Sequence, residues 1–510
     1  MAQISTNNQD YLKYFVYSKN SIFPRFLLIL FFVELWERFS YYGLRSLLFK
    51  HFVYEMGMSD AHAYFLYSFH GALGYALVII GGVLADKLLG FIKMTLIGCV
   101  VIAFGHFLIF FSKWNSDLVF LGLAFIAIGS GFFKGNITNL LGLCYKDNNQ
   151  EKKISGFTLF YVAVNVGSFS ASIICGYTKS YFGWHIALSL AGLGMLFGLM
   201  TFLKYKHVFA HLDITKQISN RTNMKRNITI LMFFTVIFAF LLAFILKYSY
   251  FSKDFFNSQN ITSIKILKII MYIISFFILG KIFFSLKSKQ EKKNIIILFI
   301  FLVFYVIFYM YEMHLGSLFL IFMDRHTNNS ILSFHVPSEV SQAINPMAVM
   351  IFGFFMSRII KSNVKTDILN FLLGLFTIIL CFAILYLGTK YIDVLGKTHY
   401  VFPMLAIVVM SIGEILIAPF IQSKTTELAP ARWKGFTMGL TMGSLSISNI
   451  WGGVIISDMF SVGRDDNFSS LQSLEIYKEG FLQIVKNHML VIILFVILIP
   501  LIRKLLKTSK

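Results

Sequence analysis

A run of ionisable and phenolic residues stands out in the segment FFVELWERFSYYGLRSLLF at residues 31–49. At 3.6 residues per helical turn their spacing places them on one helix face. The face consists of Glu34, Glu37, Arg38, Tyr41, Tyr42 and Arg45. Charged groups are costly in hydrocarbon, so such a face is expected to border a wet or protein-lined cavity. A stripe of structural salt bridges joining two helices is the alternative.

The chemistry that this face suggests is proton transfer coupled to anion binding. A partly dry cavity favours the protonated form of a carboxyl group, and a neighbouring cation opposes that effect. Glu34 and Glu37 lie within one turn of Arg38, and Lys134 is the single lysine of the fourth apolar segment. Because a proton on an acid would release its cationic partner, we predict that these four residues couple proton uptake to the binding of an anionic group.

The elements that must position these residues are long apolar segments. Of the 510 residues, 57% are hydrophobic and 14% are charged, whereas soluble domains carry about 25% charged residues. The apolar blocks are about 20 residues long, the length of a membrane-spanning helix. We expect about 14 spans, at 22–48, 64–84, 93–112, 116–144, 156–178, 186–203, 227–246, 264–282, 293–323, 338–360, 367–388, 399–423, 433–457 and 487–506.

The loops between these spans predict the orientation and the domain division. With the N-terminus inside, most lysines and arginines outside the spans fall in cytoplasmic segments, as the positive-inside rule requires. Both termini are then cytoplasmic. The longest cytoplasmic segment, 204–226, leads to three predicted parts: a six-helix bundle at 1–203, a linker with two extra helices at 204–292, and a second six-helix bundle at 293–510. Paired halves of this kind are typical of transporters with a site between them.

Other classes of protein fit the sequence poorly. The net charge of +21 lies in the short loops rather than on a basic, aromatic face, so nucleic-acid binding is not expected. The four cysteines have no metal-ligand spacing, and we expect neither a metal nor a cofactor. A polytopic membrane enzyme is a remote alternative, because the sequence has no nucleophile–base motif and no phosphate loop.

Several motifs, in order along the chain, resemble those of the proton-dependent oligopeptide transporters. ELWERFSYYGLR at 34–45 matches the first-helix signature E-x-x-E-R-F-x-Y-Y-G of that family. GGVLADKLLGFIK at 81–93 is similar to the loop motif of the major facilitator superfamily. Further similar segments are GSGFFKGN at 129–136, FYVAVNVGS at 160–168, GYTKSYFGWH at 176–185, QAINP at 342–346, GEILIAPF at 413–420 and LAPARWKGFTMG at 428–439.

The resemblance implies an all-α membrane protein with the major facilitator fold, two six-helix bundles plus two linking helices. It also implies a proton-coupled symporter that imports di- and tripeptides by alternating access, as a monomer in the plasma membrane, which is the inner membrane in bacteria. Its partners are short peptides, protons and the lipid bilayer. The same fold could instead carry an amino acid or a related metabolite.

A transporter of diverse short peptides needs to bind the two charged ends and leave the middle unconstrained. Arg38, Arg45 and Lys134 are suited to a carboxylate. Glu414, together with the amides of Asn165 and Asn345, is suited to an ammonium group. The family resemblance assigns these positions to the substrate site, and the pocket for substrate side chains is expected to include Tyr41, Tyr42, Tyr75 and Phe160.

The resemblance further implies gating ion pairs between Arg45 and Glu312 and between Lys134 and Glu414. Asp86, in the loop motif, is expected to contribute to gating and is able to cap a helix start. The neighbouring Gly81 and Gly82 are expected to allow close helix approach. One departure from the family pattern is Thr441, which stands where many members have tryptophan and is expected to enlarge or polarise a side-chain pocket.

Overall fold

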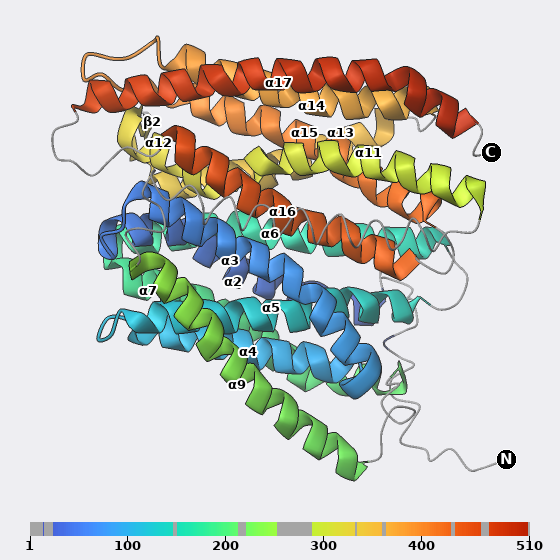
Figure 1. Ribbon diagram of the computed structural model, residues 1–510. Coiled ribbons are helices and arrows are strands. Elements are labelled where there is room, and N and C mark those ends of the chain that lie inside the picture. The colour runs from blue at the N-terminus through green and yellow to red at the C-terminus, as the bar shows by residue number, and fades with distance from the viewer. Residues whose placement is uncertain are drawn as a thin grey trace. The chain divides into compact units, whose positions relative to one another are not determined.

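The computed structural model describes Tyr14 and residues 24–145, 150–212, 221–251, 288–331, 334–359, 364–429, 434–460 and 469–507. Nearly all of these residues are helical (Figure 1). The α-helices are α2 (Arg25–Lys50), α3 (Asp60–Leu84), α4 (Phe91–Phe111), α5 (Asp117–Cys144), α6 (Gln150–Phe182), α7 (Trp184–Tyr205), α9 (Arg221–Phe251), α11 (Lys289–Glu312), α12 (Leu320–His326), α13 (Ile344–Ile359), α14 (Val364–Gly388), α15 (Val401–Leu428), α16 (Lys434–Phe460) and α17 (Ser470–Lys507).

Shorter elements connect the helices. Three π-helical turns lie at His51–Glu55, Ala85–Leu89 and Leu315–Phe319, and two 3₁₀ segments lie at Lys206–Leu212 and Ser338–Ala343. Four two-residue strands complete the described chain. The strands β1 (Thr327–Asn328) and β4 (Thr398–His399) pair in parallel, while β2 (Ser330–Ile331) and β3 (Phe334–His335) form an antiparallel pair.

The predicted spans correspond closely to these helices. Twelve helices of the described residues are long and apolar enough to cross a membrane. The helix α2, with 26 residues, is long enough to span but is not among these twelve. Its charged face lowers its hydropathy. The predicted span at 264–282 lies outside the described residues.

Two predicted spans differ from the observed helices. The last helix begins at Ser470 instead of 487, because its first turns are amphipathic and escape a purely apolar window. The predicted span 293–323 is interrupted after Glu312 and contains the π-helical turn Leu315–Phe319. The Gln342 side-chain amide donates to the Leu315 carbonyl oxygen at 2.6 Å, and so satisfies a backbone acceptor at this turn.

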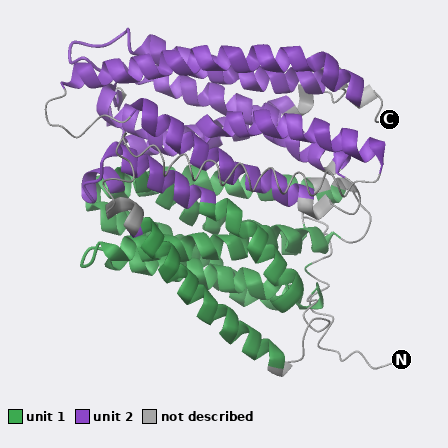
Figure 2. Cartoon of the chain, in the orientation of Figure 1, with its two compact units in different colours: residues 1–51, 73–246 green, residues 52–72, 247–510 purple. Residues whose placement is uncertain are grey.

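The chain divides into two compact units (Figure 2). Unit 1 consists of residues 1–51 and 73–246, and unit 2 consists of residues 52–72 and 247–510. The division therefore falls inside α3, whose first half belongs to unit 2. The three-part domain division derived from the sequence stays a prediction.

Unit 1 is held together by close helix packing at glycines. In α4, a β-carbon on Gly105 would lie 2.7 Å from the Gly122 carbonyl oxygen of α5. In α5, a β-carbon on Gly122 would lie 2.6 Å from the Gly105 carbonyl oxygen. Neither site can accept a larger side chain without separating the two backbones, so small residues determine this crossing.

Unit 2 is built around an aromatic cluster. Phe301 of α11 packs against Phe371 of α14 and Phe420 of α15, with ring centroids 5.2 and 4.8 Å apart. Phe495 of α17 joins the cluster at 5.4 Å from Phe371. Edge-to-face and tilted contacts of this kind add to apolar burial, and they connect four helices of the unit.

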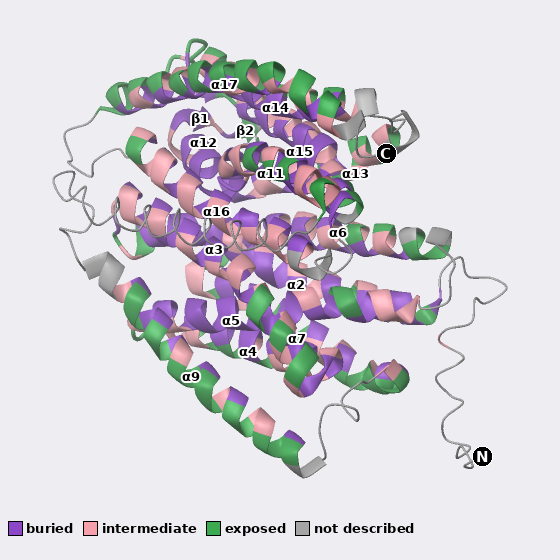
Figure 3. Ribbon diagram, turned by 45° about the vertical axis from the view of Figure 1, so that its right-hand side comes forward, coloured by how far each residue is buried: buried purple, intermediate pink, exposed green. Residues whose placement is uncertain are grey.

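Many residues of α9 and α17 are exposed (Figure 3), and large apolar side chains are among them. Phe233, Phe234, Phe240 and Phe244 of α9 are all exposed. Continuous apolar exposure of this extent is expected of a surface in contact with lipid.

Candidate functional site

The charged face of α2 forms a compact ion cluster in unit 1. The Arg38 Nε atom lies 2.6 Å from a Glu34 oxygen and 3.1 Å from a Glu37 oxygen, so one nitrogen serves both carboxylates. Both acids are buried, with exposed fractions of 2% and 1%. The Glu37 carboxylate accepts no hydrogen bond from the described residues. Buried carboxylates usually accept several hydrogen bonds, so Glu37 is the less satisfied of the two.

Close packing of α6 on α2 positions this cluster. A β-carbon on Gly167 of α6 would lie 2.5 Å from the Leu35 carbonyl oxygen and 2.9 Å from the Arg38 β-carbon. The same helix α6 carries two predicted site residues, Phe160 and Asn165, and both are buried. The Asn165 amide donates to the Tyr161 carbonyl oxygen of its own helix at 3.0 Å.

Lys134 of α5 makes a contact that the sequence did not indicate. Its ammonium nitrogen lies 3.6 Å from the centre of the Tyr41 ring and 5.3 Å from that of Tyr75. Within the described part of the chain it has neither a hydrogen bond nor an ion pair, although it is buried. The two acids instead contact Arg38. The role of these four residues in proton coupling stays a prediction.

Two opposing free energies explain how the Lys134 ammonium group can be held against the Tyr41 ring. Burying lysine in a membrane costs about 2.5–3.5 kcal/mol on insertion scales, and a desolvated cation–π contact returns about 2 kcal/mol. The phenol oxygen of Tyr41 also accepts a hydrogen bond from Arg45 at 3.0 Å. Tyr41 thus holds two cations, and its ring packs edge-on against Tyr42 at 5.2 Å.

A second polar group lies in unit 2, on α13 and α15. The Asn345 side-chain nitrogen donates to a Glu414 oxygen at 3.1 Å and to the Ser411 hydroxyl at 3.0 Å. Tyr305 of α11 lies within electrostatic range of both Glu414 and Glu312. The structure therefore brings the predicted Glu414 and Asn345 into direct contact, and it adds two residues, Ser411 and Tyr305, that the sequence had not singled out.

The loop motif is arranged differently from the expectation for Asp86. Asp86 is exposed in the π-helical turn Ala85–Leu89, and α4 begins after Gly90 with no side-chain cap. Gly90 has φ 76° and ψ 162°, a conformation that favours glycine and itself ends the turn. Gly81 confirms the expected close approach, since a β-carbon there would collide with the Gly131 carbonyl oxygen, but Gly82 has open space.

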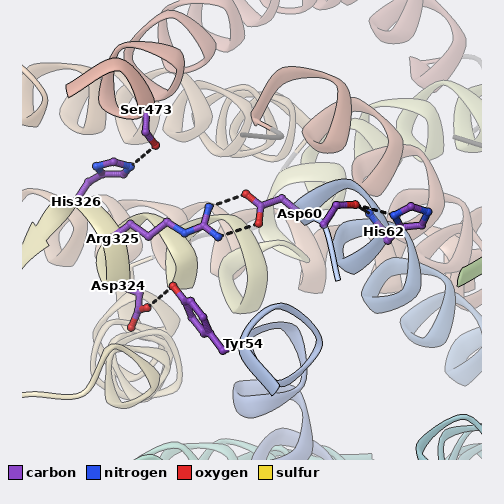
Figure 4. A network of polar contacts seen from close by, with 8 residues as sticks. Tyr54, Asp60, His62, Asp324, Arg325, His326 and Ser473 are labelled. Carbon is purple, nitrogen blue, oxygen red and sulfur yellow. Dashed lines mark hydrogen bonds and ion pairs between the residues drawn. The ribbon is translucent and has the colours of Figure 1, made fainter. Parts of the chain in front are cut away.

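Unit 2 also contains a polar network that was not expected from the sequence (Figure 4). Arg325 of α12 donates two hydrogen bonds to Asp60 of α3, at 2.6 and 2.8 Å. Nearby, Tyr54 bonds to Asp324 at 2.8 Å, and His326 bonds to Ser473 at 2.9 Å. Asp60 begins α3, and Asp324, Arg325 and His326 lie in the last turn of α12. Charges are ordinary at helix ends, so a single sequence carries no signal of this pairing.

Comparison with known proteins identifies the family. The sequence profile of the POT family matches residues 92–467. The chain belongs to the POT family. Because this is a family of transporters, the chain is a membrane transporter and not an enzyme. The family assignment agrees with the resemblance found in its sequence motifs.

Individual relatives cover almost the whole chain. The chain is 30% identical to "Dipeptide and tripeptide permease A" of Escherichia coli strain K12, over 90% of its own length and 89% of the relative's. It is 28% identical to "Dipeptide and tripeptide permease B" of Salmonella typhimurium, over 95% and 96% of the two chains. A solved structure titled "Structural insights into substrate recognition in proton dependent oligopeptide transporters" aligns with a TM-score of 0.78 at 26% identity, covering 94% and 99%. The major facilitator fold of POT transporters is thereby established for this chain.

One departure from the POT pattern takes a different form from the one expected. Thr441 of α16 is fully buried, and its hydroxyl bonds to Thr425 of α15 at 2.9 Å and to the Thr437 carbonyl oxygen at 3.1 Å. Its polar atom is thus used in joining two helices. The expectation that Thr441 polarises a side-chain pocket is not supported by these contacts.

Proposed function

We propose that this POT family member is a proton-coupled symporter that imports di- and tripeptides. The observation that carries the proposal is the buried cluster on α2, where one arginine serves two acids and Lys134 lies against the rings of Tyr41 and Tyr75. The charges of Glu34 and Glu37 balance those of Arg38 and Lys134, and Arg45 adds one further positive charge beside Tyr41. A proton added to this cluster leaves a surplus positive charge, which favours the entry of an anion such as a peptide carboxylate.

Glu37 is the proposed proton acceptor. Its buried carboxylate accepts no hydrogen bond from the described residues and lies 3.1 Å from Arg38. Protonation would remove the cost of a poorly solvated charge. It would also weaken the hold on Arg38, whose guanidinium group is suited to a carboxylate.

The two polar groups suit the two ends of a peptide. Arg38, Arg45 and Lys134 supply positive charge for the carboxylate, and Tyr41 fixes two of them. Glu414 and Asn345 supply acceptor oxygens for the ammonium, and we assign Asn165 to the same end. Tyr42, Tyr75 and Phe160 are proposed to contact the peptide's side chains. A peptide bound at both ends leaves its side chains loosely constrained, which suits a carrier of varied short peptides.

The remaining features follow from the family resemblance. Alternating access would form and break ion pairs between Arg45 and Glu312 and between Lys134 and Glu414, with Asp86 in the loop motif as a further gating residue. We propose that both termini are cytoplasmic, that the membrane is the bacterial inner membrane, and that one chain is sufficient for transport. Two measurements test whether one chain is sufficient: cross-linking of the protein in the membrane, and uptake into proteoliposomes that contain the isolated monomer.

The experiment that tests the proposal is uptake of radiolabelled dialanine into proteoliposomes with an inward proton gradient. Accumulation is expected with the gradient and should disappear with a proton ionophore. Glu37→Gln should abolish accumulation while dialanine still exchanges across the membrane. Glu475→Gln, an exposed acid of α17, is the matched control and should accumulate normally. Accumulation that survives in both Glu34→Gln and Glu37→Gln would rule out the coupling cluster.

Competition by other solutes tests the cargo. N-acetylated dipeptides should compete poorly, because a free carboxylate at Glu414 favours an ammonium partner. Equal competition by acetylated and free dipeptides would contradict the role of Glu414. Stronger competition by single amino acids than by dipeptides would favour the alternative cargo, with the same fold and the same proton coupling.

A further inference from the structure

Asn345 has a side-chain amide whose orientation can be deduced from its neighbours. Its nitrogen carries two hydrogens, and it lies 3.0 Å from the Ser411 hydroxyl and 3.1 Å from a Glu414 oxygen. An ionised carboxylate only accepts hydrogen bonds. One hydrogen is therefore directed at Glu414 and the other at Ser411, so the amide nitrogen bridges two side chains one helical turn apart on α15.

Ser411 can act only as an acceptor toward this amide. Its single hydroxyl hydrogen is donated to the Ile407 carbonyl oxygen of the preceding turn, at 2.8 Å. Only the nitrogen side of the Asn345 amide can then face Ser411, because an amide oxygen there would meet a second acceptor. Among the described residues no donor bonds to the Asn345 carbonyl oxygen, so this oxygen stays free to accept a hydrogen bond.

The backbone around Ser411 is firmly held. A β-carbon on the neighbouring Gly413 would lie 2.8 Å from Phe308 of α11 and 3.1 Å from the Gly374 carbonyl oxygen of α14. This close approach positions α15 between two other helices of unit 2. Ser411 itself is 0% exposed. It cannot touch a bound solute, and any influence it has on binding must act through another residue.

We propose that Ser411 is a positioning residue that fixes the Asn345 amide with its nitrogen toward Glu414 and its oxygen free for a ligand ammonium group. Glu414 alone cannot fix the Asn345 amide in the complex. When Glu414 also binds an ammonium group, the hydrogen bond that it accepts from the Asn345 N–H weakens. The bond to Ser411 does not depend on that charge. This inference rests on the proposed function, because it assigns the ammonium end of the peptide to Glu414 and Asn345.

The test is a double-mutant cycle on binding and uptake of dialanine by the full-length transporter. Ser411→Ala should raise KM by about threefold to tenfold, the range for one net hydrogen bond, with little change in the maximal rate. Discrimination between free and N-acetylated dialanine should narrow. Ser411→Thr and Ser411→Cys keep an acceptor atom, and at least one of them should restore KM. In an Asn345→Ala background, Ser411→Ala should have no further effect.

Controls separate positioning from a structural role. Ser448 of α16 is equally buried, and among the described residues its hydroxyl bonds to the Ser444 carbonyl oxygen of its own helix alone. Ser448→Ala should therefore leave KM unchanged. An unchanged KM in Ser411→Ala, or an equal rise of KM with and without Asn345, would overturn the proposal for Ser411 while the proposed function stands. Absence of dialanine binding by the wild-type protein would overturn the proposed function and this inference with it.

Discussion

Replacing Arg325 by alanine removes both hydrogen bonds of the ion pair with Asp60, at 2.6 and 2.8 Å. The carboxylate left behind has a side chain only 4% exposed. Breaking a buried ion pair costs about 3–5 kcal/mol. The arginine retains 23% exposure, which weakens the pair. The expected cost therefore lies at or just below the lower end of that range, at about 2–3 kcal/mol.

The two single variants should differ, because they leave different charges unpaired. Asp60→Ala leaves a partly exposed guanidinium that reaches water, so its cost should be smaller than that of Arg325→Ala. The double variant has no unpaired buried charge. It should therefore be more stable than Arg325→Ala alone, which is an unusual order for an added mutation.

Thermal unfolding of purified protein in one detergent, at one scan rate, measures this order. Unfolding of membrane proteins is often irreversible, so apparent midpoints are compared and not free energies. Arg325→Ala should lower the midpoint by about 3 °C or more, and Lys478→Ala, which removes an exposed ion pair within α17, should not change it. A midpoint for Arg325→Ala equal to that of wild type, or a double variant less stable than both single ones, would refute the reasoning.

Three further outcomes are expected. Gly81→Ala should lower the yield and the midpoint through overpacking of about 1–3 kcal/mol, while Gly82→Ala, with open space around it, should behave as wild type. Lys134→Ala should reach the membrane normally but fail to concentrate dialanine, and Tyr41→Phe, which keeps the ring beneath the ammonium, should impair accumulation less than Tyr41→Leu. Asp393 accepts two loop N–H bonds that lower its pKa. The Leu395 and Lys397 amides should thus be fully protected from hydrogen exchange at a pH above the ordinary pKa of an aspartate. This protection should be lost only as the pH falls through the lower pKa of Asp393 in the folded protein. Asp393→Ala should remove the protection at neutral pH.

Sequence reasoning was most effective where neighbouring positions carry the information. The polar face of α2 followed from spacing alone, and the structure places Glu34, Glu37 and Arg38 in one ion cluster. Most spans could be predicted from the apolar segments, because the free energy of transferring a helix into the bilayer is a sum of contributions from the residues of that helix. The start of α17 at Ser470 was missed because its amphipathic turns lack an apolar window.

Contacts between residues far apart in the chain could not be predicted from the sequence in the same way. Asp60 and Arg325 are separated by 265 positions, and each is an unremarkable helix-end charge in the sequence. Lys134 was expected to meet an acid, yet it lies on the ring of Tyr41. Arg38 forms ion pairs with both first-helix acids from within α2 itself. Glu34, four positions before Arg38, also accepts its hydrogen bond, as expected of neighbours on one helix face.

The sequence by itself determined that the chain is a helical membrane protein with a charged first helix, because both properties depend on composition and periodicity within single segments. The tertiary structure alone decided which buried charges meet and how the amides are oriented. A side chain's partner depends on which atoms of other helices remain free after every bond nearby has been formed. Asn345 illustrates this: its amide direction depends on Glu414 and on the hydroxyl hydrogen that Ser411 donates to its own helix.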